Sequence, residues 1–424
     1  MGGVSSPLME KNVINPNQPA SAAGCNTTLF QSSIYSSRNA MTEGDSSTTA
    51  VSGNLGGLNM IVKRPKGKSA FMFGVIPNTT KGYNLIRTTE HDVVGEVIER
   101  YQGSGGTSRG YLGLARGFKG KKWKKAGERD SVLINNITDQ IGGQVNYLFG
   151  EIEQQERLDI QDITFLDNRT STSMRHRALG GLFGLQYHQL LGAKYDDQKN
   201  FIRSTSLYLG GTYATASKLN TDYEKIIETI VLLSSVETNV DTAFYSSRVH
   251  EGTTPSRFTG GAAISFDAGS GRRIVLAADL MMEDWTKNSE SNDYLLEGNF
   301  VWAAASRNSV GLSFKPGDSG SNKSALSRTT YKVGVVHENH PLNYKVDDTN
   351  YSQLKSWRAT AGFSMPLEGS RSNSSVHFGV SYGKRNLDGT VLDNSLEESI
   401  FNIQLGVTLA PFFKNLWLTP KLYD

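Results

Sequence analysis

Residues 375–409 have the sequence SVHFGVSYGKRNLDGTVLDNSLEESIFNIQLGVTL, and two runs within this stretch alternate strictly between apolar and polar or small side chains. The apolar positions are Val376, Phe378, Val380 and Tyr382 in the first run, and Phe401, Ile403, Leu405, Val407 and Leu409 in the second. A period of two is that of a β-strand, in which successive side chains point to opposite faces. The segment Lys384–Glu398, with turn residues at its centre, joins the two predicted strands.

The two faces of these strands differ as they do in a membrane barrel. The face that carries Asn, Gln, Thr, Ser and Gly suits a wet or side-chain-packed lumen, whereas the face rich in Val, Phe and Leu suits lipid. Each run is close to the roughly nine to eleven residues that cross a bilayer at a strong tilt. We therefore interpret residues 375–409 as the closing pair of strands of an outer-membrane β-barrel.

The bulk composition supports one large barrel. The chain has 424 residues with 44 glycines, 17 tyrosines and 18 phenylalanines, yet its mean hydropathy is only −0.38. No window approaches the roughly 18 apolar residues of a membrane-spanning helix. The nearest, Ile274–Met282, is interrupted by Asp279. A helical membrane protein is excluded on this ground, whereas a barrel needs apolar residues only at alternate positions.

Charge and cysteine content narrow the function classes further. A net charge of +3 argues against a nucleic-acid partner. A single cysteine, Cys25, excludes an intrachain disulfide framework and a cysteine zinc site. Met1–Met9 lacks the basic and apolar runs of a signal peptide, so we expect the signal to have been removed or to lie outside this chain. A cytoplasmic protein would also lack one, but it would not explain so many alternating strands of bilayer length.

The chain divides into a short N-terminal segment and the barrel. Residues 1–24 are polar and small, and Pro16 and Pro19 forbid a strand or helix interior there. We expect residues 1–24 to form a plug and residues 25–424 to form an all-β, antiparallel transmembrane barrel of about 14 strands. The predicted connectors alternate between long ones, Arg38–Thr48, Pro77–Asp92 and Gly120–Asn136, and short ones, Lys63–Lys68 and Gly103–Thr107. Leu219–Val236 fits a strand or a loop with a helical turn.

Several spaced residues resemble a known family. The small residues Met1–Val4 precede Asn15-Pro16; Pro255 precedes a strand pair that includes Asp279 and ends at Trp285; and Glu398 precedes the last strand, followed by Trp417. This order resembles the FadL/TodX outer-membrane transport barrels in the version typical of Bacteroidota. The resemblance implies a fourteen-stranded barrel whose N-terminal hatch plugs the lumen. It also implies passage of hydrophobic molecules, such as long-chain fatty acids or aromatic hydrocarbons, without a cofactor.

The family hatch carries an Asn-Pro-Ala motif. Asn15 and Pro16 match its first two residues, but Asn17 stands in the third position, and Pro19-Ala20 follows three residues on. The resemblance implies that Asn15, Pro16, Pro19 and Ala20 belong to the hatch. No ligand-contacting residue of the family can be aligned.

Three patterns could indicate an enzyme, and each has a simpler interpretation. Gly379–Gly383 matches the G-x-S-x-G nucleophile motif, with His377 on the same face, but no helix follows to form the elbow that this motif needs. Gly317–Gly320 echoes a serine-protease loop and is better explained as a turn. His337–His340 lacks the spacing of a metalloprotease helix, and we interpret these histidines as loop residues at a strand end. We expect no enzyme activity and no metal.

The remaining features concern the membrane interfaces. Lys121, Lys122, Lys124 and Lys125 flank Trp123 in a predicted outer loop, where they could contact phosphates of lipopolysaccharide or simply be solvated. Trp285, Trp302, Trp357 and Trp417 fall near strand ends, as in an aromatic girdle. The glycine clusters Gly103–Gly106 and Gly180-Gly181 are better explained by barrel bends or packing under a plug than by a phosphate site.

The sequence favours passive uptake of hydrophobic small molecules across the outer membrane. No nucleotide site is visible, so movement would be driven by transfer of apolar surface into lipid. The alternative is a non-transporting barrel that binds protein, like the family member used in type IX secretion. Its predicted contact residues in or near long loops are Phe118, Trp123, Phe165 and Leu166. A barrel lipase using Ser381 is a third hypothesis.

Overall fold

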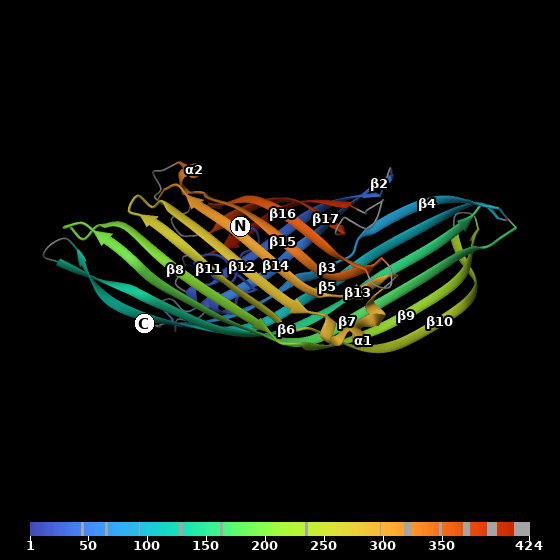
Figure 1. The fold of residues 1–424 in the computed structure, drawn as a ribbon, viewed down its shortest axis with the longest axis horizontal. Helices are drawn as coiled ribbons and strands as arrows, with labels where there is room; N and C mark the ends of the chain where they lie inside the picture. The colour runs from blue at the N-terminus through green and yellow to red at the C-terminus, as the bar shows by residue number, and fades with distance from the viewer. Residues whose placement is uncertain are drawn as a thin grey trace, which may run out of the picture.

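The computed structural model describes residues 1–43, 46–63, 67–92, 94–126, 130–161, 164–233, 236–296, 298–317, 324–346, 350–367, 374–387 and 397–410. Most of them lie in strands (Figure 1). The strands are β1 (Leu29–Glu43), β2 (Ser46–Lys63), β3 (Ser69–Thr80), β4 (Tyr83–His91), β5 (Gly95–Ala126), β6 (Asp130–Ile160), β7 (Asp167–Tyr195), β8 (Phe201–Ala214), β9 (Ser217–Leu233), β10 (Val236–Thr254), β11 (Arg257–Ala268), β12 (Arg273–Asp284), β13 (Phe300–Trp302), β14 (Ala304–Lys315), β15 (Thr330–Lys345), β16 (Tyr351–Pro366), β17 (Ser375–Leu387) and β18 (Glu397–Leu409).

Fourteen of these strands form a closed antiparallel barrel, as predicted. The ring runs β1–β2–β3–β5–β6–β7–β8–β11–β12–β14–β15–β16–β17–β18, and β18 closes it on β1 from Phe30 opposite Leu409 to Thr42 opposite Glu397. The stretch at residues 375–409 does supply the closing pair, with Val376 opposite Val407 and Tyr382 opposite Phe401. Closure joins the first and last strands of the ring, so the barrel sheet has no terminal strand.

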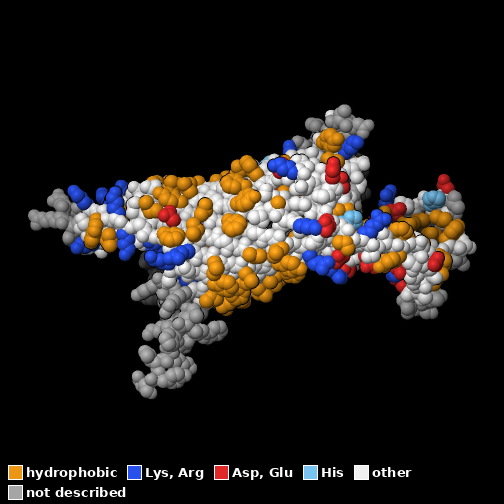
Figure 2. All heavy atoms as spheres, turned by 90° about the horizontal axis from the view of Figure 1, so that it is seen from below, with side chains coloured by type: hydrophobic (Ala, Val, Ile, Leu, Met, Phe, Trp, Pro, Cys, Tyr) orange, Lys and Arg blue, Asp and Glu red, His pale blue; other side chains and the backbone are white. Residues whose placement is uncertain are grey.

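The outward faces of the barrel strands form an apolar band. Figure 2 shows hydrophobic side chains gathered over the middle of the molecule, with most charged side chains toward its two ends. On β7, for example, Leu179, Phe183 and Leu185 are exposed, while Leu182 and Gln186, at positions of the opposite parity, are buried. Large apolar side chains exposed on one face at every second residue are what a lipid-facing barrel wall requires.

The four remaining strands lie outside this ring, and three of them build a projecting sheet. The halves of β5, β6 and β7 that run beyond the barrel pair with β4 and β9, and β9 pairs with β10. We call this six-stranded extension the wing (right side of Figure 1). β5 contains 32 residues, or about 105 Å at roughly 3.3 Å per residue, far more than a bilayer crossing needs. The fourth strand, β13, pairs with the end of β15.

The wing is where the predicted connectors are wrong. Gly103–Thr107 is not a turn but part of β5, and Pro77–Asp92 is the end of β3 followed by β4. Gly105 and Gly106 have φ of 91° and 155°, which bulkier residues rarely adopt, and they lie where β5 leaves the barrel. In the sequence, the glycine-rich bend within β5 therefore resembled a turn between two strands.

Three further segments differ from expectation. Gly120–Asn136 is mostly a hairpin of β5 and β6, not a loop. The described residues of Leu219–Val236 are strand, because the pairing of β9 with β7 on one edge and β10 on the other outweighs the helical spacing. His337–His340 lies within β15, where a bulge lets the strand continue past Pro341.

The two ends of the barrel differ. At the end opposite the wing, short connections join β2 to β3, β5 to β6, β7 to β8 and β11 to β12, and we call it the turn end. The short helices α1 (Ser289–Asn292), η2 (Thr286–Asn288) and η3 (Asp293–Leu295) lie between β12 and β13, while α2 (Ala325–Arg328) precedes β15. The last element, η1 (Pro19–Gly24), belongs to the N-terminal segment. Within the described residues, no helix has the length and apolar character to cross a membrane.

Candidate functional site

The N-terminal segment (residues 1–24) lies against the inner wall of the barrel. Its strongest anchor is Asp279, which projects inward from β12. The backbone N–H groups of Ser5 and Ser6 donate to Asp279 Oδ2 at 2.6 and 3.0 Å, and Ser6 Oγ donates to Asp279 Oδ1 at 2.7 Å. A carboxylate that accepts several hydrogen bonds in a buried place holds a loop firmly, because breaking any one of them leaves a buried donor unpaired.

A group of amides extends this anchor to the neighbouring strands. Gln18 Nε2 donates to the carbonyl oxygen of Ser6 at 3.0 Å and lies 3.2 Å from that of Leu185 on β7. Gln186 Nε2, from the same strand, donates to the Ser6 and Leu8 carbonyl oxygens at 2.8 and 3.1 Å. The segment has little regular structure, so side-chain amides satisfy backbone groups that a helix or sheet would otherwise pair.

Glycines make room for the segment on the wall beneath it. Three pairs of inward-facing glycines are directly opposed across neighbouring strands: Gly142 and Gly184, Gly210 and Gly261, and Gly311 and Gly334. A Cβ at Gly142 would lie 2.5 Å from the Ala20 nitrogen, and one at Gly210 would overlap the Ser6 carbonyl. The backbone of the segment therefore contacts the backbone of the wall directly, and any side chain at these positions would displace it.

The middle of the segment carries a charge pair with the wall. Lys332 Nζ on β15 donates to both carboxylate oxygens of Glu10 at 2.7 and 2.9 Å. Burial alone would raise the pKa of Glu10, but the ammonium of Lys332 holds the pKa of this carboxyl below its ordinary value. Both side chains border the cavities described next, so the pair lies in the path through the lumen.

The largest cavity within the lumen, among the described residues, has a volume of 850 Å³. Small and polar side chains such as Gln31, Ser33, Asn402 and Gln404 line much of it. Two smaller cavities of 550 and 270 Å³ lie along the N-terminal segment.

The 850 Å³ cavity reaches the wall where β2 and β3 separate. β2 pairs with β3 only from Leu58 to Lys63, and no described strand pairs with the β3-facing edge of Ser46–Gly57. Ser52, Gly56 and Pro77–Thr80, on either side of this separation, all line the cavity. We call the separation the β2–β3 window.

The window opens onto the apolar band. Gly53 and Leu55 lie on the unpaired edge of β2. Across the neighbouring strand β1 they are level with Ile403 and Leu405 of β18, which are exposed on the outer face. A solute that leaves the lumen between Gly56 and Asn78 would therefore emerge beside lipid chains.

A basic side chain faces the same cavity. Arg358 on β16 lines it, and its Nε atom has no hydrogen-bond partner despite being buried. Arg385 on β17 also lines it but is partly neutralised by Glu398, 3.0 Å away. A buried N–H donor without a partner is costly, which makes Arg358 a candidate contact for an anionic group.

Comparisons with known proteins fit this geometry. A family model described as BamG matches residues 1–421. The chain belongs to the BamG family. A search of curated proteins gave no significant match.

Two solved structures share the fold of this BamG-family barrel. The Pseudomonas putida toluene transporter TodX is 13% identical with a TM-score of 0.54, and a Pseudomonas aeruginosa FadL homologue is 12% identical with a TM-score of 0.52. Each alignment covers 97% of this chain and 96% of the other. The FadL/TodX-like fold predicted from the spaced residues is confirmed.

The structure places the predicted hatch residues in or beside the lumen. Pro19 and Ala20 are buried at the start of η1, against Gly142. The Asn15 side chain donates to the Ser5 carbonyl oxygen at 2.9 Å, and the Pro16 carbonyl accepts from Gln144 at 3.2 Å. Asn17, which departs from the family motif, accepts a hydrogen bond from Arg109 at 2.7 Å.

The other residues picked out by the family resemblance lie in separate parts of the molecule. Besides Asp279, only Glu398 faces the lumen; Pro255 lies between β10 and β11, and Trp285 stacks on Trp302 at the end of β12 with ring centroids 4.9 Å apart. Trp417 lies outside the described residues. Sequence reasoning missed Ser6, Gln18, Gln186 and the paired glycines, because their role depends on strand pairing that local pattern does not give.

The remaining motifs do not assemble a catalytic site among the described residues. His377 hydrogen-bonds Ser364 at 2.8 Å and Thr408 at 2.9 Å, while Ser381 accepts from Asn402 at 3.2 Å. Gly317–Gly320 falls mostly outside the described residues. No group of three or more potential metal ligands occurs in the described part of the chain.

The predicted surface contacts fall at opposite ends of the molecule. Lys121, Lys122, Lys124, Lys125 and Trp123 all project into solvent on the β5–β6 hairpin at the turn end. Phe165 and Leu166, in the β6–β7 connection, are exposed at the tip of the wing. The lysines were expected on the same side as the long loops, and the continuous β5 strand places them on the other.

Proposed function

We propose that this chain passes amphipathic or hydrophobic small molecules across the outer membrane through the lumen and out through the β2–β3 window. The observation that carries the proposal is the 850 Å³ cavity, which is continuous from the lumen to a window in the apolar band. Bacterial membrane barrels have short periplasmic turns and longer external loops. We therefore assign the wing end to the outside and the turn end to the periplasm.

The fold supports transport in general, because one neighbour of similar fold is named as a toluene transporter and another as a FadL homologue. The lining of the cavity argues for a more specific solute. Its polar side chains and the unsatisfied Nε donor of Arg358 favour a molecule with an anionic head over a neutral hydrocarbon. We propose a long-chain fatty acid, whose carboxylate contacts Arg358 while its chain leaves through the window.

The direct test is uptake of labelled long-chain fatty acid by cells that express the chain. Asn78→Trp would fill the window, because Asn78 lies on its β3 side and is exposed to the cavity. We expect uptake to fall toward that of cells without the protein. Asn84→Trp, which adds the same side chain to an exposed position on β4 of the wing, is the control and should leave uptake unchanged.

A second pair of variants tests whether the solute is a fatty acid or a neutral hydrocarbon. Arg358→Gln removes the cation and should lower uptake of the fatty acid while leaving toluene uptake unchanged. Lys384→Gln, on the next strand and paired with Glu397 at 2.5 Å, is the matched control. Equal loss of both solutes with Arg358→Gln would contradict the fatty-acid assignment but not transport itself.

The wing favours a second candidate function, the binding of a protein partner. β10 contains 19 residues, and no described strand pairs with its outer edge, along which Val240, Phe244 and Val249 are exposed. An unpaired edge of this length can take an added strand from another chain. A photo-crosslinking amino acid at Tyr245 should then give one defined product in cells, and absence of any product would leave transport as the sole function.

A further inference from the structure

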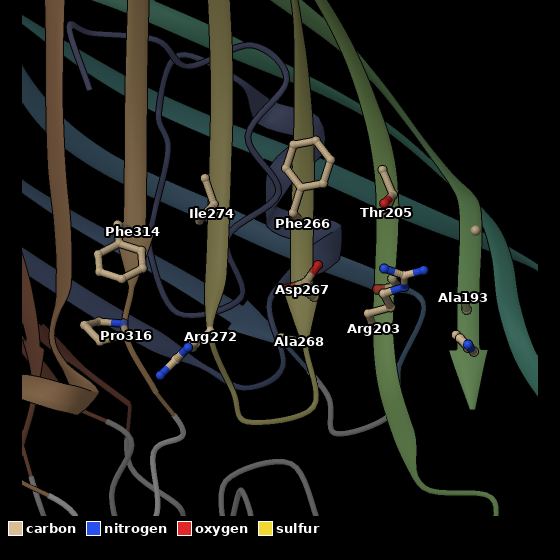
Figure 3. Close-up of a pocket in the computed structure, with 13 residues that line it drawn as sticks. Ala193, Arg203, Thr205, Phe266, Asp267, Ala268, Arg272, Ile274, Phe314 and Pro316 are labelled. Carbon is tan, nitrogen blue, oxygen red and sulfur yellow. The ribbon is translucent and has the colours of Figure 1, made fainter. Parts of the chain in front are cut away.

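We infer that the outer wall of the barrel carries a binding site for one anionic phospholipid of the periplasmic leaflet. The site is a groove of 910 Å³ over β7, β8, β11, β12 and β14 at the turn end (Figure 3). It opens on the outer face of the wall, with the N-terminal segment behind the wall in this view, and only its turn-end margin at Asp267, Ala268 and Arg272 is shared with the 550 Å³ cavity along that segment. The inference does not depend on the transport proposal.

The groove has an apolar row that continues the lipid-facing band. Phe266 on β11 is opposite Ile274 on β12, and Ile274 is opposite Phe314 on β14. The three side chains are 44%, 40% and 39% exposed. A row of large apolar side chains that point outward across neighbouring strands suits acyl chains.

A row of cations follows one step closer to the turn end. Lys194 on β7 is opposite Arg203 on β8, and Arg203 is opposite Ala268. Arg272 lies across the same hairpin from Ala268, whose N–H donates to the Arg272 carbonyl at 2.9 Å. Figure 3 shows Arg203 and Arg272 on either side of Ala268.

These cations have no carboxylate partner within ion-pair distance among the described residues. The nearest carboxylate that lines the groove, Asp267, accepts from Ser265 at 3.0 Å and pairs with Arg273 at 3.4 Å. Asp196, in the β7–β8 turn, is bonded to Asn200 at 2.6 Å instead. The positive charge of Lys194, Arg203 and Arg272 is therefore available to a ligand.

The order of the two rows identifies the ligand class. Passing from the band to the turn end, acyl-binding side chains come first and phosphate-binding side chains second, which is the order of chain and headgroup in a membrane lipid. A free phosphate would need only the cations. The turn end faces the periplasm by the connector rule, so the lipid is a glycerophospholipid rather than lipopolysaccharide. The lysines of the β5–β6 hairpin add positive charge at the same end.

The test is native mass spectrometry of the purified full chain after exchange into detergent with added lipid. We expect one retained phosphatidylglycerol, and less retention of the zwitterionic phosphatidylcholine and of lipid A. Arg203→Gln with Arg272→Gln should lower phosphatidylglycerol retention by about fivefold for each charge removed, the factor expected for a basic side chain near an anionic surface. Heat-modifiable migration on gels checks that the variant barrel is folded.

The control is Lys225→Gln with Arg248→Gln, two basic residues on the wing that lie outside the groove. It should retain phosphatidylglycerol as the unaltered chain does. Equal retention by the groove variant, equal retention of phosphatidylcholine, or preference for lipid A would each overturn the inference. Displacement of the lipid by millimolar inorganic phosphate alone would also contradict it, because the apolar row would then contribute nothing.

Discussion

The strands β5, β6 and β7 each belong to two regions of different character. In the barrel, the outward side chains of β7 are Leu179, Phe183 and Leu185, and the inward face contacts the N-terminal segment. In the wing, the same outward face carries Arg169 and Arg175, and the inward face is contacted by α1 and η3, where Tyr294 stacks on His250 and hydrogen-bonds Thr221. The backbone pairing is the same in both regions, so only the side chains and the closure of the sheet distinguish them.

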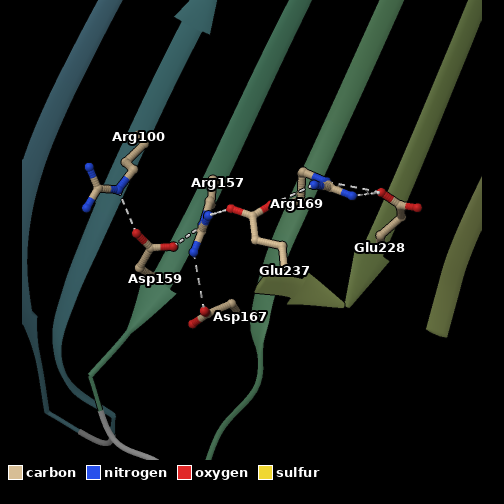
Figure 4. Close-up of polar contacts among 7 residues, drawn as sticks. All are labelled: Arg100, Arg157, Asp159, Asp167, Arg169, Glu228 and Glu237. Carbon is tan, nitrogen blue, oxygen red and sulfur yellow. Dashed lines mark hydrogen bonds and ion pairs between the residues drawn. The ribbon is translucent and has the colours of Figure 1, made fainter. Parts of the chain in front are cut away.

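The wing replaces apolar burial with ion pairs. Figure 4 shows a row of seven charged residues that crosses β5, β6, β7, β9 and β10. Arg100 pairs with Asp159 at 2.6 Å, Arg157 contacts Asp159 and Glu237, and Arg169 pairs with Glu228 at 2.8 Å and with Glu237 at 3.0 Å. Two bulges in β10, at Asn239/Asp241 and Thr242/Phe244, interrupt its pairing with β9. Charges and bulges are ways to stabilise an open sheet in water without inviting aggregation.

In the barrel, the N-terminal segment is held in the lumen by direct contact between its backbone and the backbone of the wall. Gly210→Val should disrupt this contact most severely. The added side chain overlaps the Ser6 carbonyl, so we expect the segment to leave its seat. Planar-bilayer recordings should show conductance well above that of the unaltered chain. The control is Gly211→Val at the adjacent outward position, where the nearest atom to an added Cβ is 3.8 Å away. It should not raise conductance.

Asp279→Ala tests the polar anchor and should have the next largest effect. It removes the four hydrogen bonds that Ser5 and Ser6 donate, of which the two from Ser6 are buried. A buried donor left unsatisfied costs roughly 1–3 kcal/mol, so we expect a loss of about 3 kcal/mol. Hydrogen exchange in residues 1–24 should then rise by about a hundredfold. The control is Asp267→Ala, which removes an inward carboxylate whose partners among the described residues are Ser265 and Arg273; if it speeds exchange equally, the anchor is not specific.

The wing gives the smallest expected effect. Arg169→Ala removes two ion pairs from a partly exposed site and should cost no more than about 1 kcal/mol. Exchange should rise a few-fold in the wing half of β7 and in β9, with the barrel strands unchanged. Arg87→Ala on β4 is the control. An equal rise in the barrel would show that the two regions unfold together.

Much of the barrel could be predicted from sequence because lipid imposes a strict period. The alternation at Val376–Tyr382 and Phe401–Leu409 predicts both strands and their pairing partner. The wing could not be predicted in this way, since water on its outer face removes the apolar signal. Ile226 and Ile230, four residues apart, suggested a helix, although each lies in a strand paired on both edges.

The site was less predictable than the fold. Asp279 was singled out only through the family resemblance, and Arg358 was not singled out at all. The chain has 44 glycines, and no sequence pattern around the opposed ones, such as Gly210 and Gly261, distinguishes them from the rest. Their pairing is a property of strands far apart in sequence, and the β2–β3 window arises from the absence of pairing.

A reversible disulfide across the β2–β3 window tests most directly whether solute leaves the lumen sideways through this window. A Cβ at Gly82 would lie 3.9 Å from the Ser52 Cβ, within the roughly 3.5–4.5 Å of a disulfide. In a Cys25→Ala background, Ser52→Cys with Gly82→Cys should form a bridge that prevents β2 and β3 from moving apart. We expect low fatty-acid uptake when the pair is oxidised and recovery after reduction; equal uptake in both states would show that solute does not leave through the window.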